Sequence, residues 1–245
     1  MARTARQKSE SGFYHVMIRG IGKQILFEDN EDFNRFLITV KRYLREHEVQ
    51  IHAYCMMENH VHMLIRDPQK ELAVFMKKLE GNYAFYFNHK YERIGTLFQE
   101  RYKSEPIDND EYFAVVLRYI LQNPLKAGIC AVETYPWSSY SEIVKRREII
   151  QTDFAEDFFG GKESLLEYIL RENDDICMEP SPAPINDSRA KQIIHNRLHI
   201  ESGTQLQSYE KNERDKALRI LKENGLSIRQ IERLTGINRG IVLKA

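Results

Sequence analysis

Three stretches in the first half of the chain alternate between apolar and polar residues with a period of two. This period is typical of β-strands, because successive side chains of a strand point to opposite faces of a sheet. The polar pair Glu58 and Asn59 separates two of these stretches, which predicts a β-hairpin. Together with a fourth, shorter run, the predicted strands are residues 13–19, 49–56, 60–66 and 96–103.

Apolar residues recur at helical spacing between these strands, in residues 31–47, 72–87 and 110–121. The last of these ends ahead of Pro124, since a proline disfavours helical backbone in the residue before it. The order is strand, helix, strand, strand, helix, strand and a further helix. This order predicts an α+β fold, a ferredoxin-like (split βαβ) antiparallel sheet with helices on one face.

After residue 140 the pattern predicts short helices only. Two of them, at 227–234 and 238–244, flank Gly236 and Ile237, which suit a tight turn and a return to the core. The unit is similar to a helix-turn-helix, although an ordinary corner between two helices has the same pattern. The other helices are predicted at 163–172, 189–200 and 209–223.

These patterns divide the chain into three parts. Residues 1–150 form the expected catalytic domain, residues 151–189 an acidic helical and linker segment that includes EPSPAPINDS at 179–188, and residues 190–245 a helical DNA-binding module. The net charge is zero, but its distribution is uneven. Residues 151–190 hold three basic against ten acidic side chains, and residues 191–245 hold eleven against six. A positive C-terminal module is compatible with contacts to a phosphate backbone, and also with an ordinary surface.

The composition is that of a globular protein, with 42% hydrophobic and 29% charged residues. The three cysteines, Cys55, Cys130 and Cys177, are far apart, which argues against a disulfide framework and a thiolate zinc site. No apolar run approaches the roughly 18 residues that a membrane helix needs. We therefore expect a cytoplasmic protein without a membrane partner.

The motif Asn59-His60-Val61-His62 is the sharpest chemical feature. In a strand, His60 and His62 stand on one face, where their imidazoles can chelate one metal ion. A half-exposed strand that carries two histidines by chance has the same sequence, so other residues have to decide between the two interpretations.

Two such residues are Tyr119 and Asn123. They are four positions apart on a predicted helix and therefore share one face of it. A divalent ion held by His60, His62 and Asn123 would polarise a phosphodiester that Tyr119 attacks. Tyr112, seven positions before Tyr119, is the alternative nucleophile, and a water molecule on the metal is a third possibility.

These residues carry a resemblance to a known family. The segments YHVMIRG, AYCMMENHVHMLI, FQERYKS, LRYILQNPLKAG and YPWSSY occur in the family's order at 14–20, 53–65, 98–104, 117–128 and 135–140. The region from Phe13 to Tyr140 thereby resembles the single-tyrosine HUH transposases, in particular their REP-associated branch. One position departs from the pattern, since Glu58 stands where a proline commonly precedes Asn-His.

The resemblance implies that His60, His62 and Asn123 bind Mg²⁺ or Mn²⁺ and that Tyr119 is the nucleophile. It also implies single-stranded or hairpin DNA as the substrate, a 5′-phosphotyrosine intermediate, and either a monomer or a homodimer. Two other classes stay open. One is a catalytically silent regulator that binds hairpin DNA on the same fold, and the other is an RNA-binding protein, although the aromatic signature of RNA-binding sheets is missing.

Several polar side chains near these motifs are candidates for contacts with DNA. In the predicted catalytic domain they are Arg19, Arg101, Lys103 and Arg118, and in the C-terminal module Arg229, Arg233, Asn238 and Arg239.

Overall fold

The computed structural model describes residues 6–145, 148–175, 177, 187–226 and 228–244. The chain divides into two compact units, residues 1–180 and 181–245, which are treated separately below. Most of the predicted linker at 179–188 lies outside the described residues, and its last two residues belong to a helix of the second unit.

The first unit contains an antiparallel sheet of four strands in the order β2-β3-β1-β4. This order is that of the predicted ferredoxin-like fold, which is therefore confirmed. The strands are β1 (Phe13–Arg19), β2 (Gln50–Met57), β3 (His60–Arg66) and β4 (Lys103–Ile107).

The fourth strand corrects the prediction of 96–103. It begins at Lys103 and contains Pro106, whose missing N–H would interrupt a central strand. Because β4 pairs only with β1 and lies at the edge of the sheet, the proline is tolerated there.

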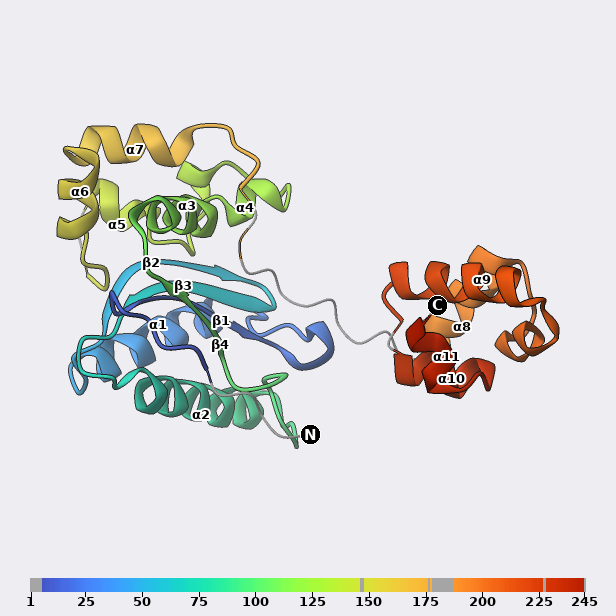
Figure 1. Ribbon diagram of the computed structural model, residues 1–245. Helices are drawn as coiled ribbons and strands as arrows, with labels where there is room; N and C mark the ends of the chain where they lie inside the picture. Colours follow the sequence, from blue (N-terminus) through green and yellow to red (C-terminus); the bar gives the residue numbers. More distant parts are fainter. Residues whose placement is uncertain (1–5, 146–147, 176, 178–186, 227, 245) are drawn as a thin grey trace. The chain divides into compact units, whose positions relative to one another are not determined.

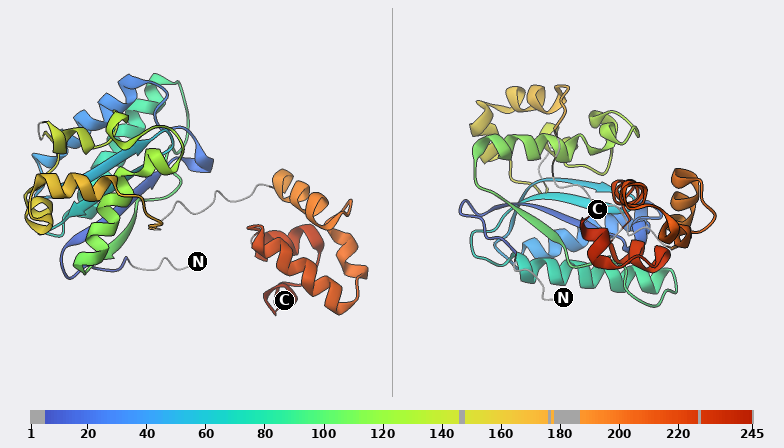
Figure 2. Two further views of the ribbon diagram at one scale, coloured as in Figure 1. Left: turned by 90° about the horizontal axis from the view of Figure 1, so that it is seen from above. Right: turned by 45° about the vertical axis from the view of Figure 1, so that its right-hand side comes forward.

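Helices cover both faces of this sheet (Figure 1). Helices α1 (Asn30–Leu44) and α2 (Leu72–Lys90) pack together on one face, as predicted. Helix α3 (Asp110–Leu121) packs against β2, β3 and β4 on the other face. The side chain of Asn109 accepts the Tyr112 N–H and caps the start of α3. The right-hand view of Figure 2 shows the same three layers.

The remaining helical elements of the first unit are short. All but one follow α3, and α4 and α7 pack against it. The helical elements other than α1, α2 and α3 are η1 (Ile21–Lys23), α4 (Asn123–Lys126), η2 (Val132–Thr134), α5 (Tyr140–Val144), α6 (Asp153–Phe159) and α7 (Lys162–Leu170).

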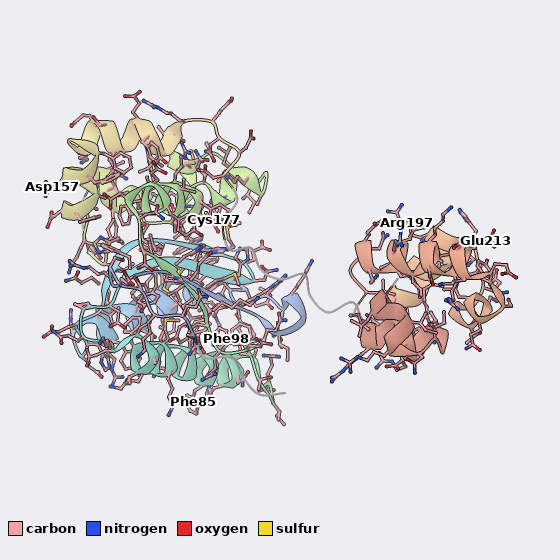
Figure 3. The ribbon with its side chains drawn as sticks, in the orientation of Figure 1. Phe85, Phe98, Asp157, Cys177, Arg197 and Glu213 are labelled. Carbon is pink, nitrogen blue, oxygen red and sulfur yellow. The ribbon has the colours of Figure 1, made fainter. Side chains whose placement is uncertain are left out.

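The expected domain boundary at residue 150 falls inside the first unit. Ala155, Leu165 and Ile169 are buried in the same core as the sheet, and α7 packs on α3. Cys177, labelled in Figure 3, also belongs to this core. The apolar side chains of α6 and α7 therefore make this part of the chain belong to the first unit, although its acidic composition predicted a separate segment.

The second unit has its own core of small and aliphatic side chains. Gly236 occupies the turn between its last two helices at a φ of +71°, a conformation that favours glycine. The buried residues include Ile194, Leu218, Ile231 and Val242. The elements are α8 (Asp187–Leu198), η3 (Gly203–Ser208), α9 (Lys211–Glu223), α10 (Ile228–Thr235) and α11 (Arg239–Lys244).

In the part of the chain that the structure describes, no helix has the length and apolar character that crossing a bilayer requires.

Candidate active site

The two histidines of β3 lie on the face of the sheet that α3 covers. Their ring centroids are 5.0 Å apart. The sequence placed both side chains on one face of a strand, and in the structure His62 is fully buried while His60 is partly exposed. His62 is covered because α3 packs directly against β3. Within this pair, His62 is therefore the inner residue and His60 is the outer residue, which solvent can reach.

A third histidine, which sequence reasoning missed, belongs to this site. His15 on β1 lies on the same face, because β1 and β3 pair with Met17 opposite His62. Its Nε2 atom is 2.9 Å from Nδ1 of His62, a hydrogen-bond distance. The alternation of residues 13–19 placed His15 on one face of a strand, but only the register between β1 and β3 brings it to His62.

Burial keeps these inner histidines neutral. Removal from water lowers the pKa of His15 to about 3 and holds the pKa of His62 well below its ordinary value. The neighbouring imidazoles of His15 and His60 lower the pKa of His62 further. Both side chains are therefore uncharged at neutral pH, and a neutral imidazole is the form that coordinates a metal ion.

Tyr119 faces the histidines from α3. Its ring centroid lies 5.7 Å from that of His62 and 5.9 Å from that of His15, with edge-to-face geometry in both cases. All three residues come from the same chain, so the tyrosine and the histidines meet without a second copy. The ammonium group of Lys126 lies 5.1 Å from the centroid of the Tyr119 ring, and this cation is a second feature that sequence reasoning missed.

Tyr112, the alternative nucleophile, has a different environment on the same helix. Its hydroxyl donates a hydrogen bond to Oε2 of Glu105, at 2.7 Å. Burial raises the pKa of the Tyr112 phenol, and the hydrogen bond to this carboxylate raises it further. Tyr112 is thus held as a neutral phenol, whereas Tyr119 lies beside imidazoles and a cation. Of the two tyrosines, Tyr119 is the one whose ring lies against the histidines.

Helix α3 ends at Leu121, Gln122 is its C-cap, and Asn123 is the first residue of α4. Its Nδ2 atom donates a hydrogen bond to the backbone carbonyl of Tyr119, at 3.2 Å. This bond fixes the amide next to the tyrosine and assigns its oxygen as the atom that can act as an acceptor or a metal ligand.

The donor atoms of this site suit a divalent ion. Nε2 of His62 is buried and has no hydrogen-bond partner, which is unfavourable for a polar atom unless a ligand binds there. Nδ1 of His60 is 2.7 Å from Oδ1 of Asn59, which orients that ring. No cluster of three or more His, Cys, Asp or Glu side chains among the described residues is arranged to hold a metal ion. The set expected from the sequence contains only two such side chains, with an amide as the third ligand.

The four basic residues predicted near these motifs divide into two groups. Arg19 is paired in register with His60, and Lys103 with Met17, so both lie on the face of the histidines. Arg101 instead lines an apolar cavity of about 540 Å³ beside α2. Arg118 points away from the site, because its Nε atom is 2.8 Å from Oδ2 of Asp175 and its guanidinium stacks on Tyr168.

The four polar residues predicted in the second unit are all exposed. Arg229 and Arg233 belong to α10, and Asn238 and Arg239 lie at the start of α11. Arg233 forms an ion pair with Asp187, which offsets part of its charge. Oδ1 of Asn238 accepts the N–H of Gly240 and so caps α11.

Known proteins resemble this chain in sequence and in fold. A curated protein of Haemophilus influenzae, named as a REP-associated tyrosine transposase, is 24% identical over 155 residues, which are 58% of this chain and 86% of the relative. A solved structure titled as a REP-associated tyrosine transposase bound to a REP hairpin has a TM-score of 0.52 and 17% identity. The match covers 73% of this chain and 96% of the chain in that structure, and this likeness shows the fold.

Residues 8–123 match the family described as "Transposase IS200 like". The matched region contains the whole sheet, helix α3 and the residues His60, His62, Tyr119 and Asn123. The part of the chain that holds this site is therefore similar in sequence to the IS200-like transposase family.

Proposed function

We propose that this chain is a metal-dependent enzyme that nicks and rejoins single-stranded or hairpin DNA through a 5′-phosphotyrosine intermediate. The observation that carries the proposal is the position of Tyr119, whose ring lies 5.7 Å from that of His62, a histidine whose Nε2 atom is buried and has no hydrogen-bond partner. A phenol beside neutral metal-binding side chains suits attack on a phosphodiester.

His60, His62 and Asn123 would hold the metal ion, Mg²⁺ or Mn²⁺, through two imidazole nitrogens and one amide oxygen. When bound, this ion supplies charge neutralisation and polarisation of the scissile phosphate. The chain itself fixes the ligands, since Asn59 orients His60 and the carbonyl of Tyr119 orients Asn123.

The chemical step exchanges one phosphoester bond for another. Oη of Tyr119 loses its proton and forms a bond to phosphorus, the bond from phosphorus to the 3′ oxygen breaks, and the released 3′ oxygen takes a proton. The ammonium of Lys126 donates a hydrogen bond to the carbonyl of Asp175 and lies 5.1 Å from the centroid of the Tyr119 ring, where its charge would favour negative charge on that residue. Attack by a 3′-hydroxyl on the phosphotyrosine reverses these bond changes and rejoins a strand.

The DNA partner is supported by the solved relative, whose title names a REP hairpin. Arg19 and Lys103 lie on the face of the proposed site and would contact phosphates of the strand that enters it. In the second unit, the exposed Arg229, Arg233, Asn238 and Arg239 would contact DNA through α10 and the start of α11.

Trapping of the covalent intermediate tests this function. The wild-type protein is incubated with labelled hairpin DNA and Mn²⁺ and then denatured, and the label is expected to migrate with the protein. The double variant His60→Ala, His62→Ala is expected to lose this adduct, because the phosphate charge is no longer neutralised.

Each other result contradicts the proposal in a distinct way. An adduct in the double histidine variant would refute the metal site. Specific binding without an adduct would identify a silent regulator, and cut DNA without labelled protein would identify a water nucleophile.

A further inference from the structure

The contact between His15 and His62 joins two fully buried imidazoles of neighbouring strands. The distance from Nε2 of His15 to Nδ1 of His62 is 2.9 Å, and the ring centroids are 5.1 Å apart. Both side chains have zero exposure to solvent. The outer nitrogens of the pair, Nδ1 of His15 and Nε2 of His62, have no hydrogen-bond partner.

One shared proton decides which atom of His62 can bind a metal. A neutral imidazole carries one N–H and one lone pair, on different nitrogens. If Nδ1 of His62 donates to Nε2 of His15, the lone pair of His62 lies on Nε2. If Nε2 of His15 donates instead, Nε2 of His62 carries a proton and cannot coordinate a metal ion.

The neighbouring ligand shows the same arrangement with a different acceptor. Nδ1 of His60 lies 2.7 Å from Oδ1 of Asn59, and an amide oxygen can only accept. Nδ1 of His60 is therefore the protonated nitrogen, and its Nε2 has the lone pair. A matching tautomer at His62 gives both histidines of the pair the same ligand atom.

We propose that His15 is a positioning residue, which accepts the Nδ1 proton of His62 and so holds Nε2 of His62 as a metal ligand. This inference rests on the proposed function of His60 and His62. Histidines that bind metals usually donate their other N–H to a carboxylate, a carbonyl or water. Here a neutral imidazole has that role, so the acceptor adds no charge to the site.

Packing alone does not account for His15, as another buried histidine of the same sheet illustrates. His52 on β2 is surrounded by the rings of Phe13, Phe113 and Phe154. Neither of its ring nitrogens has a hydrogen-bond partner. His52 is thus a histidine buried among aromatic rings rather than against another imidazole, and it provides a matched control.

Binding of Mn²⁺ to the full-length protein without DNA tests the proposal independently of activity. In calorimetric titrations, His15→Phe is expected to weaken Mn²⁺ binding by about 10- to 100-fold, the usual cost of losing such a partner. His15→Gln is expected to restore most of the affinity, because its amide oxygen can accept the same proton. His52→Phe should bind like the wild type.

Nitrogen NMR of the imidazoles gives a second measurement, which needs no variant to fold. With the diamagnetic ion Mg²⁺, the wild-type protein is expected to show His62 protonated at Nδ1 and His15 protonated at its own Nδ1. A proton on Nε2 of His62 in the Mg²⁺-bound protein would overturn the proposal.

The two proposals fail in different ways. If His62→Ala abolishes Mn²⁺ binding but His15→Phe binds like the wild type, the role of His15 is wrong and the metal site stands. If His62→Ala binds Mn²⁺ as well as the wild type does, the metal site is wrong, and the role of His15 fails with it.

Discussion

The two units of this chain place their candidate functional residues in opposite environments. In the first unit, His15, His62 and Tyr119 are buried, and the two histidines are neutral. In the second unit, Arg229 and Arg239 are exposed and charged. In the proposed function, the first set would act through short contacts with fixed geometry, whereas the second would act through charge at the surface.

This difference indicates a division of labour. Electrostatic stabilisation of a transition state is strongest where water is excluded and the groups are already oriented. Contacts to a phosphate backbone depend on surface cations that displace counterions, and they tolerate looser geometry. We therefore expect changes in the first unit to alter the rate of the chemical step and changes in the second to alter DNA affinity.

The largest expected effect is on the nucleophile of the first unit. Tyr119→Phe removes one oxygen and keeps the ring, so the fold and the affinity for DNA should change little. Formation of the covalent adduct should fall by on the order of 10³-fold or more, as in other enzymes that lose their nucleophile. The measurement is the fraction of labelled DNA that remains attached to denatured protein.

Tyr112→Phe is the matched control for this variant, since it removes the same atom from the same helix. The hydroxyl of Tyr112 is hydrogen-bonded to Glu105 in the wild type, and Tyr112→Phe should still form the adduct. An adduct that persists in Tyr119→Phe and disappears in Tyr112→Phe would reverse the assignment.

Removal of residues 181–245 should have the next largest effect, and on a different quantity. The affinity for hairpin DNA is expected to fall by about 10- to 100-fold at 0.1 M salt, with a shallower salt dependence, because fewer cations contact phosphates. The rate of adduct formation at saturating DNA should persist. Fluorescence of Trp137, which stacks on Phe33 in the first unit, checks that this unit stays folded. An unchanged affinity and salt slope would assign the second unit to another role.

Asn123→Ala sharpens the comparison inside the first unit. Because water can replace one neutral oxygen ligand, Mn²⁺ affinity should fall by roughly tenfold, less than in His62→Ala. Calorimetric titration with Mn²⁺ measures both variants. A loss as large as that of His62→Ala would mean that Asn123 also maintains the position of Tyr119 and the end of α3.

The double variant Arg229→Ala, Arg239→Ala examines the second unit with smaller changes. Each lost phosphate contact should reduce the slope of log affinity against log salt by about 1. Arg214→Ala is the control, because Arg214 is already paired with Asp215 at 3.0 Å. Equal effects of the two changes would argue against a specific contact surface on α10 and α11.

The smallest expected effect concerns stability and pH. Burial lowers the pKa of His52 to about 4 in the folded protein, below the value near 6.5 of the unfolded chain. Between these values the unfolded state binds more protons, so His52 makes the unfolding free energy rise with pH from about 4 to about 6.5. His52→Phe should reduce this slope by up to about 1.4 kcal/mol per pH unit. Urea titrations followed by Trp137 fluorescence measure it, and an unchanged slope would show that His52 does not titrate in this way.

The sequence determined the elements whose pattern is strong within a short window. The stretch 110–121 has apolar residues at helical spacing and a proline soon after it, and it forms a helix with those bounds. The strands 13–19 and 60–66 alternate with a period of two and also have the predicted bounds. The same alternation placed His60 and His62 on one face.

Only the tertiary structure decided which residues meet across the fold. His15 and His62 are 47 positions apart, and Arg118 and Asp175 are 57 positions apart, so no local pattern relates them. The same holds for β4, since Pro106 is acceptable only at the edge of a sheet. A local pattern reports the face of one element, whereas register and layer packing choose the partner on the next element. For this reason, His60, His62, Tyr119 and Asn123 could be proposed from the sequence, but the burial of His62 and its hydrogen bond to His15 could not.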